Sequence, residues 1–243
     1  TRLILGIHKK LIPKGHGEYR KLQNQIKNMT TNKVLYTPPT APDIPSLMGN
    51  WEKTMNEQNE EWDPLIKCAI GHYQFESIHP FGDGNGRTGR ILMVLQLIQD
   101  EILSLPILFI SGYINQHRSE YYQFLNAVTK HQQWNEFIIY ILKAFYHQAK
   151  ETKEILLKIM RHFSEFKMQV KTNHKKIYSA DLVEALFSYH IVTPVKLSAL
   201  LDTHYTTASR HLLELAKGGL LKEGKYGKYH LFVNEGLLRI MKK

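Results

Sequence analysis

The 243-residue chain is long enough for one or two domains with apolar cores, because 43% of its residues are hydrophobic. It is also strongly basic, with a formal net charge of +10. No apolar run reaches the ~18–20 residues that a membrane-spanning helix requires. A single cysteine excludes an internal disulfide, and the absence of His-x₃-His and Cys-x₂-Cys pairs argues against a zinc site. With no secretory signal visible, these features favour a cytoplasmic protein that makes no membrane contact.

The first predicted element is a short extended segment. Residues 32–36, Asn-Lys-Val-Leu-Tyr, favour a β-strand, and the prolines between residues 38 and 45 keep the following chain out of a helix. Such a segment can offer an edge to an incoming strand of another protein. A plain proline-rich connector is the alternative.

Two apolar helices are predicted on either side of a polar loop. Residues 64–75 form the first apolar stretch, and residues 91–98, which lack Gly and Pro, form the second. Between them lies His-Pro-Phe-Gly-Asp-Gly-Asn-Gly-Arg-Thr-Gly-Arg, residues 79–90. Its glycines therefore lie where the second helix begins, and a helix N-terminus offers N–H groups to an anion.

The loop 79–90 carries side chains that suit a phosphate site and that an apolar core does not need. It contains one histidine, one aspartate, one asparagine, four glycines and two arginines. Glycines let backbone N–H groups approach anionic oxygens, and arginines neutralise phosphate charge. An aspartate can anchor a divalent cation, and a histidine can accept a proton near neutral pH. A glycine-rich turn between two core helices is the alternative, but it does not account for this combination.

The positions of four side chains can be interpreted from their spacing and surroundings. Arg87 and Arg90 are three residues apart, so we expect them on one helix face, where they can grip one ligand. His72, on an apolar helix, is interpreted as a core histidine with a satisfied hydrogen bond. Glu76 is interpreted as an acid on the helix surface, and a supporting role at the site is the alternative.

The second half of the chain predicts a long helix and then a small module. From Ile155 to Val170, apolar residues recur at spacings of one, three and four, which indicates a helix with one apolar stripe. Residues 171–176 are polar and basic and are interpreted as a linker.

Residues 178–243 have the pattern of a winged helix. Ser179 is expected to cap a helix through residue 187, Thr193 to open one through residue 201, and a third helix spans 206–215. Residues 220–233, with a glycine-containing turn, predict a hairpin. DNA contacts would come from the start of the third helix and from the hairpin, at Thr206, Thr207, Ser209, Arg210, His211, Lys225, Tyr226 and Lys228. Nine basic against six acidic residues is a mild bias, so we favour a protein contact and leave DNA as the alternative.

Residues 79–90 fill every position of the pattern His-Pro-Phe-x-(Asp/Glu)-Gly-Asn-Gly-Arg-x-x-Arg, and in this the chain resembles the Fic family. A less specific likeness extends over about residues 3–145. It involves residues 7–11, 17–20, 23–24, 36–39, 44–48, 113–114 and 117–122. The resemblance implies a mainly α fold: a Fic-type helical bundle with a short β-hairpin flap, followed by a linker helix and a small winged-helix domain. The expected domains are 1–145 (catalytic), 146–177 (linker helix) and 178–243 (winged helix-turn-helix).

The resemblance further implies protein adenylylation, in which AMP passes from ATP to a Ser, Thr or Tyr hydroxyl of a target protein and pyrophosphate leaves. It implies that His79 is the general base, that Asp83 holds Mg²⁺, and that Phe81 packs inward and fixes the loop. The residues implied to bind ATP and its phosphates are Gly84, Asn85, Gly86, Arg87, Arg90, Tyr121 and Tyr122. The two tyrosines can equally lie half in the core and half on the surface. The implied flap that docks the target is Lys33, Val34, Leu35 and Tyr36.

Several alternatives stay open. A Fic-type enzyme can use another nucleotide or remove AMP, and a DNA-bound regulator can use the loop to sense a nucleotide. Fic proteins often carry an inhibitory helix with the pattern (Ser/Thr)-x-x-x-Glu-(Gly/Asn), which the sequence does not contain. Without such a helix, we expect that no inhibitory glutamate occupies Arg90 and that the enzyme is uninhibited. Self-modification on incubation with ATP and Mg²⁺ would support this expectation. A homodimer is a further open expectation.

Overall fold

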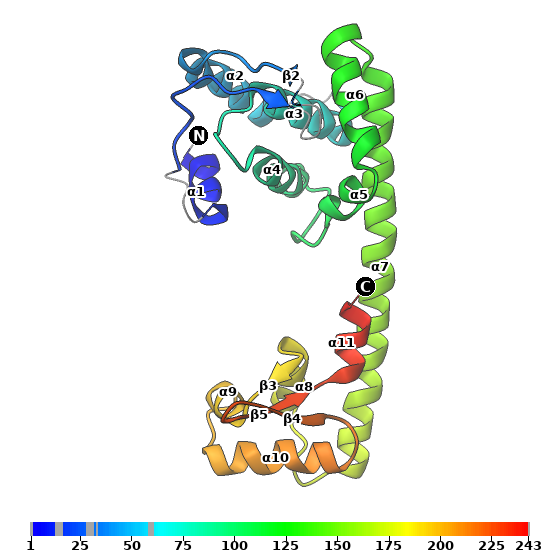
Figure 1. Ribbon diagram of the computed structural model, residues 1–243. Coiled ribbons are helices and arrows are strands. Elements are labelled where there is room, and N and C mark those ends of the chain that lie inside the picture. Colours follow the sequence, from blue (N-terminus) through cyan, green and yellow to red (C-terminus); the bar gives the residue numbers. More distant parts are fainter. Residues whose placement is uncertain (1, 13–16, 28–31, 33, 58–60, 243) are drawn as a thin grey trace. The chain divides into compact units, whose positions relative to one another are not determined.

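The computed structural model describes residues 2–12, 17–27, 32, 34–57 and 61–242. Within these residues the protein is mainly helical and has two small antiparallel sheets, as predicted (Figure 1). The chain divides into two compact units, residues 1–150 and 151–243, and each has its own hydrophobic core. None of the helices described is both long and apolar enough to cross a membrane.

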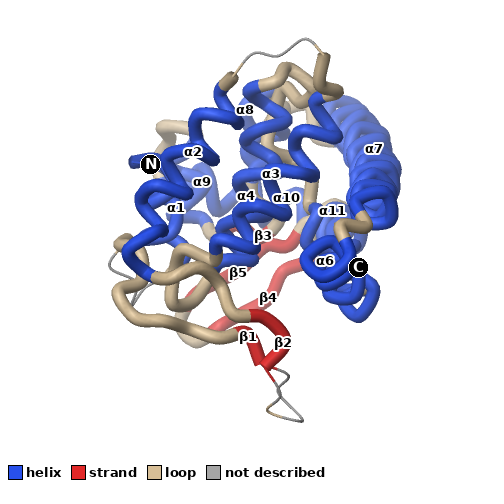
Figure 2. Tube along the Cα trace, turned by 90° about the horizontal axis from the view of Figure 1, so that it is seen from above, coloured by secondary structure: helices blue, strands red, loops and turns tan. Residues whose placement is uncertain are grey.

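The first unit is built mainly from helices and also contains a short, largely exposed hairpin. Strands β1 (Ile26–Lys27) and β2 (Val34–Tyr36) pair antiparallel, with Ile26 opposite Tyr36, and Figure 2 shows them in red. This confirms the predicted hairpin; Lys33 lies outside the described residues. The helices are α1 (Arg2–Leu11), α2 (Ile44–Asn56) after a short 3-10 turn (Ala41–Asp43), α3 (Pro64–Ile78), α4 (Asn85–Gln99), α5 (Ile110–Gln116) and α6 (Arg118–His131).

Helices α3 and α4 pack against each other and carry the loop 79–84 between them. Asp63 starts α3 by accepting hydrogen bonds from the N–H groups of Leu65 and Ile66. Pro64 fits the first turn because the N–H that proline lacks would have no helical acceptor there. The α3 helix ends at His79, whose φ of 50° is left-handed and turns the chain. The predicted helices 64–75 and 91–98 are confirmed, and α4 begins at Asn85, inside the glycine-rich run.

The second unit has the predicted order of helices and hairpin. Its elements are α8 (Ala180–Ser188), β3 (Ile191–Val192), α9 (Pro194–Leu200), α10 (Tyr205–Lys217), β4 (Lys222–Tyr226), β5 (Tyr229–Val233) and α11 (Glu235–Met241), with strand order β3-β5-β4. The side chains of Ser179 and Thr193 cap α8 and α9 as expected. Strand β3 and helix α11 were not predicted.

The long helix differs from its prediction. Helix α7 runs from Trp134 to Asn173, so it begins earlier than the apolar stripe suggested. Residues 171–173, which were interpreted as linker, are still helical. Polarity and positive charge do not stop a helix, because Lys has a high helix propensity and favours the helix C-terminus. Helix α7 contributes Phe137 and Ile141 to the first core and Phe166 and Val170 to the second.

Candidate functional site

The loop between α3 and α4 is closed by the side chain of Asn85. Its Oδ1 accepts a hydrogen bond from the Phe81 N–H at 2.9 Å, and its Nδ2 donates to the Phe81 carbonyl at 2.7 Å. The buried amide thus satisfies both backbone groups of Phe81. The Asn85 side chain is committed to the loop itself, which leaves the backbone N–H groups of the first turn of α4 to meet an anion.

Phe81 packs inward, as expected, and is fully buried against Phe75. Its other face is stacked on His8 of α1, with ring centroids 3.8 Å apart and an interplanar angle of 7°. His8 Nε2 also lies 2.9 Å from the Asp83 carbonyl, to which it donates. Gly84 has φ +82°, and a Cβ there would lie 2.7 Å from Ile12, so this position requires glycine.

His79 is oriented to accept a proton. Its Nδ1 lies 3.2 Å from the Glu76 carbonyl, which can only accept, so the Nδ1–H donates and Nε2 keeps a lone pair. Burial lowers the pKa of His79 from its usual 6.5, and the positive charge of Arg20 lowers it further, while the Glu76 carbonyl opposes both. The imidazole is therefore neutral at pH 7, as a general base must be.

Arg20 holds the left-handed turn at His79. Its Nε donates to the His79 carbonyl at 3.0 Å, and its backbone N–H donates to the Pro80 carbonyl at 2.9 Å. The guanidinium also donates to the carbonyls of Leu22 and Pro39. This role was not predicted, because no local feature of the sequence distinguishes Arg20 from the other basic residues near it.

Asp83 and Arg87 are paired with each other. Arg87 Nη2 lies 3.1 Å from Asp83 Oδ2, and the Gly84 N–H donates to Asp83 Oδ1 at 2.6 Å. Both side chains are exposed, 77% for Asp83 and 51% for Arg87.

Among the residues described, no three His, Cys, Asp or Glu side chains gather as metal ligands. Mg²⁺ usually keeps several waters and takes one or two carboxylates beside substrate phosphates, so Asp83 fits as a single protein ligand.

A cavity of about 630 Å³ lies beside the loop, a size that suits a small organic ligand. We call it the loop cavity. Its lining includes His79, Gly82, Gly86 and Arg90 of the loop and α4, Leu35 and Tyr36 of the hairpin, and Glu76, Tyr121 and Tyr122 of α3 and α6. Five further residues expected at the site do not line it: Val34, Asp83, Gly84, Asn85 and Arg87.

The two tyrosines of α6 are half core and half surface, and both line the loop cavity. The buried Tyr121 hydroxyl is 2.8 Å from His72 Nε2, so His72 is a core histidine as predicted. Only its Nε2 is paired in this way, because the buried Nδ1 has no hydrogen-bond partner among the described residues. Tyr122 is 45% exposed, and its hydroxyl accepts a hydrogen bond from Arg118 at 3.3 Å.

The interpretation of Glu76 as a surface acid is wrong. Its Oε1 is shielded from solvent, and the residue lines the loop cavity close to Arg90. Helical position explains the error: Glu76 lies on α3 one turn before His79, and this face of α3 is covered by α4. The Arg90 Nε donates to Ser111 Oγ of α5 at 2.8 Å, another contact that the sequence analysis missed.

These features define a helical protein in which a neutral histidine, an arginine and a helix N-terminus border one cavity. Residues 1–97 match the model of the Fic/DOC family, and residues 162–237 match the model of the C-terminal domain of the protein adenylyltransferase SoFic-like. The chain therefore contains a Fic/DOC family domain followed by a SoFic-like C-terminal domain.

Two curated relatives and one solved structure are similar to this chain. A protein adenylyltransferase Fic from Drosophila grimshawi is 35% identical over 134 residues, which are 52% of this chain and 25% of that relative. One from Culex quinquefasciatus is 33% identical over 132 residues, 52% and 24% of the two chains. The chain thus spans about a quarter of the length of these relatives. A Fic family protein from Desulfovibrio desulfuricans G20 shares the fold, with a TM-score of 0.53, 24% identity, and coverage of 95% of this chain and 67% of that one.

Proposed function

We propose that the chain transfers AMP from ATP to a Ser, Thr or Tyr hydroxyl of a target protein and releases pyrophosphate. The observation that carries the proposal is that His79, Gly86 and Arg90 line one cavity beside the N-terminus of α4. The match to Fic/DOC and SoFic-like domains, and the similarity to proteins named protein adenylyltransferase Fic, support it.

In the proposed reaction, neutral His79 takes the proton of the target hydroxyl at Nε2. The hydroxyl oxygen forms a bond to the α-phosphorus of ATP while the bond to pyrophosphate breaks. Arg90 and the N–H groups at the start of α4 stabilise the negative charge on the phosphates, and positioning accounts for much of the rate. Asp83 would hold Mg²⁺, which neutralises phosphate charge when bound.

Strand β2 is the proposed docking site for the target. Within the described residues, β2 pairs only with β1, so its other edge can accept an extended segment. Val34 and Leu35 are partly exposed there, and the Tyr36 hydroxyl donates to the Ser77 carbonyl at 2.8 Å. That bond joins the hairpin to α3 next to His79, so a strand added at β2 brings its side chains to the base.

ATP labelled at two positions tests the reaction. Transfer of label from the α-phosphate, but not from the γ-phosphate, to the chain itself or to a bait protein is the expected result. Transfer of the γ-label instead would show phosphorylation, and release of free AMP from a pre-modified bait would show that the chain removes AMP by hydrolysis. The rate should fall as pH drops through the pKa of His79, below 6.5, because protonation removes the base.

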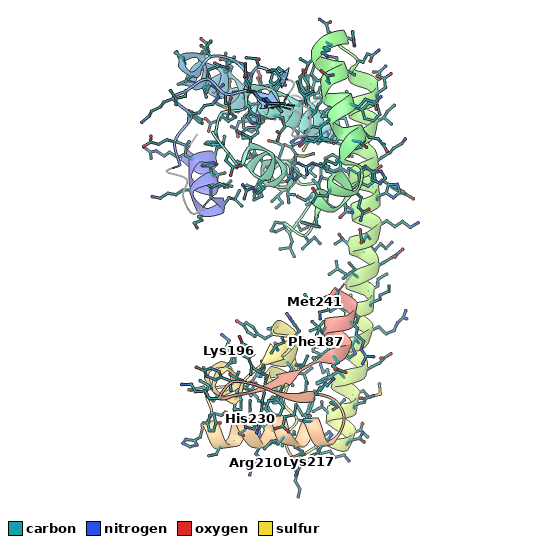
Figure 3. All side chains as sticks on the ribbon, viewed as in Figure 1. Phe187, Lys196, Arg210, Lys217, His230 and Met241 are labelled. Atoms are coloured by element: carbon teal, nitrogen blue, oxygen red, sulfur yellow. The ribbon has the colours of Figure 1, made fainter. Side chains whose placement is uncertain are left out.

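For the second unit we propose the role of a winged helix that contacts protein. The exposed side of α10 carries Tyr205 and Leu213 together with Arg210 and Glu214, a mixture that suits a protein surface better than a phosphate backbone. Figure 3 labels Arg210 and Lys217 along this helix. A salt-dependent shift of a DNA probe by the whole chain would overturn this role.

Three further expectations stay proposals. Self-modification would appear as an added AMP in the mass spectrum of the chain after incubation with ATP and Mg²⁺. A homodimer would appear in sedimentation. A cytoplasmic location agrees with the single buried cysteine.

A further inference from the structure

Glu76 and Arg90 approach the same glycine-lined surface of α4. A Cβ placed at Gly86 would lie 3.0 Å from Arg90 Nη1 and 3.8 Å from Glu76 Oε1. A Cβ at Gly89 would lie only 2.7 Å from Glu76 Oε1. The two glycines thus leave room for the Glu76 carboxyl group and the Arg90 guanidinium, which both approach this surface at the edge of the loop cavity.

The two groups differ in how well they are held. Arg90 is fixed from one side by the hydrogen bond from its Nε to Ser111. Glu76 Oε1 is shielded from solvent and has no hydrogen-bond partner among the described residues. A buried oxygen without a partner is costly, and the cost is larger when the carboxyl group is ionised. The site therefore favours a protonated Glu76 unless a positive charge compensates it.

Three other titratable groups surround this pair. Tyr121 faces Glu76 from α6, and burial raises its pKa well above 10, so it stays neutral. His72, one turn earlier on α3, has its pKa lowered to about 3 by burial and by Arg90, so it is neutral as well. His79, one turn later, is neutral at pH 7. Arg90 of α4 is then the only charged partner of Glu76 among these groups. Burial raises the pKa of Glu76 to about 7, although Arg90 opposes the rise.

We propose that Glu76 is a positioning residue that competes with the nucleotide phosphates for Arg90 and takes up a proton when a nucleotide binds. The inference rests on the proposed function in that the loop cavity must bind a nucleotide. Ionised Glu76 partly neutralises the positive charge of Arg90, and it repels phosphate oxygens that bind the same guanidinium. Protonated Glu76 leaves the full positive charge to the phosphates. Because coupling is reciprocal, bound phosphates favour the protonated carboxyl by the same factor.

The direction of the pH effect follows. Below the pKa of Glu76 the carboxyl is already neutral, so binding is at full strength. As pH rises above about 7 the carboxyl ionises and nucleotide affinity falls. Glu76→Gln keeps the shape of the side chain and removes its charge at every pH. The variant and the unmodified chain should therefore bind about equally at pH 6. If binding raises the pKa of Glu76 by about one unit, the variant should bind about fivefold more tightly at pH 8, and the difference should approach about tenfold at higher pH.

Calorimetry of the whole chain with Mg²⁺ and a non-hydrolysable ATP analogue tests this at pH 6 and pH 8. At pH 8, buffers of different ionisation enthalpy give the number of protons taken up on binding. The analogue's own protons are common to all variants, so the difference between the unmodified chain and Glu76→Gln isolates Glu76. Glu136→Gln, which removes an exposed acid of α7, should behave like the unmodified chain. Glu76→Asp shortens the side chain but keeps its charge, so it should retain the pH dependence of binding. If it does, the effect of Glu76→Gln comes from the lost charge and not from a change of shape.

The expected result is a smaller proton uptake and a tighter complex at pH 8 for Glu76→Gln alone. Equal affinity and equal proton uptake in the unmodified chain and Glu76→Gln would overturn the inference while leaving the nucleotide site intact. Absence of binding by the unmodified chain at both pH values would overturn the proposed function, and this inference with it.

Discussion

The two units of the chain bury different kinds of side chain. Among the described residues of the first unit, eight buried side chains are polar or charged: His8, Arg20, Lys67, His72, Asn85, Thr88, Gln96 and Gln148. Among the residues of the second unit that the structure describes, Asn234 is the one buried polar side chain. Burying a polar group costs free energy unless it gains partners. Three of the eight side chains in the first unit, those of His8, Arg20 and Asn85, offset that cost by hydrogen bonds to the loop 79–90, whereas the second unit builds an ordinary apolar core.

The buried polar side chains of the first unit therefore help to hold the site in shape, whereas the apolar core of the second unit holds its fold. His8, Arg20 and Asn85 bond backbone groups of the loop, so their polar contacts fix its shape. In the second unit several polar contacts are instead helix caps at the starts of elements, as at Ser179 and Thr193. A substitution at one of the loop contacts in the first unit should therefore affect binding or chemistry, whereas a substitution in the second unit should affect stability alone.

The largest expected effect is on catalysis. His79→Ala should lower the rate of AMP transfer by ~10²–10⁴-fold, because it removes the general base, and should leave nucleotide affinity within a few fold. Labelling kinetics and calorimetry measure the two quantities. His131→Ala, at an exposed position of α6, is the matched control. Equal loss of nucleotide affinity and of rate would mean that His79 holds the loop rather than takes a proton.

The second unit should respond to the loss of an apolar side chain. Leu212 of α10 is fully buried, and Leu212→Ala should destabilise this unit by ~2–5 kcal/mol through lost burial and a cavity. Chemical denaturation followed by circular dichroism gives the change. Leu213→Ala, at a neighbouring position that is 37% exposed, should cost much less. Loss of nucleotide affinity in Leu212→Ala, under conditions where the chain is folded, would contradict the separation of the two roles.

Asn85→Ala tests whether a polar contact holds the loop. The change leaves the Phe81 N–H and carbonyl without their partner, at ~1–3 kcal/mol for each buried group. Thermal unfolding should show the loss of stability, and nucleotide affinity should fall because the loop opens. Asn115→Ala, at an exposed position of α5, should change neither quantity. A loop that binds nucleotide normally without Asn85 would show that glycine geometry alone is sufficient.

The sequence predicts the second unit better than it predicts the supports of the site. The caps, the helix order and the hairpin depend on residues close together in the chain, so local rules find them. The loop 79–90 is also local and is recognised by its composition. The contacts of His8 with Asp83 and of Arg90 with Ser111 join residues 75 and 21 positions apart. No periodicity or spacing marks such pairs, and for the same reason Glu76 was misplaced on the surface.

The smallest effect concerns one of the contacts that the sequence did predict. Ser179 Oγ accepts a hydrogen bond from the Leu182 N–H at 3.0 Å and so satisfies one of the free N–H groups at the start of α8. Ser179→Ala should destabilise the second unit by ~1 kcal/mol, while Ser188→Ala near the end of the same helix should have almost no effect. The Ser188 hydroxyl only donates to the Glu184 carbonyl, which is already a helical acceptor. Denaturant midpoints at equal slope measure both changes. Because Ser179 bonds no part of the loop 79–90, AMP transfer should be unchanged, and an equal loss in the two variants would show that the cap contributes nothing beyond a surface hydroxyl.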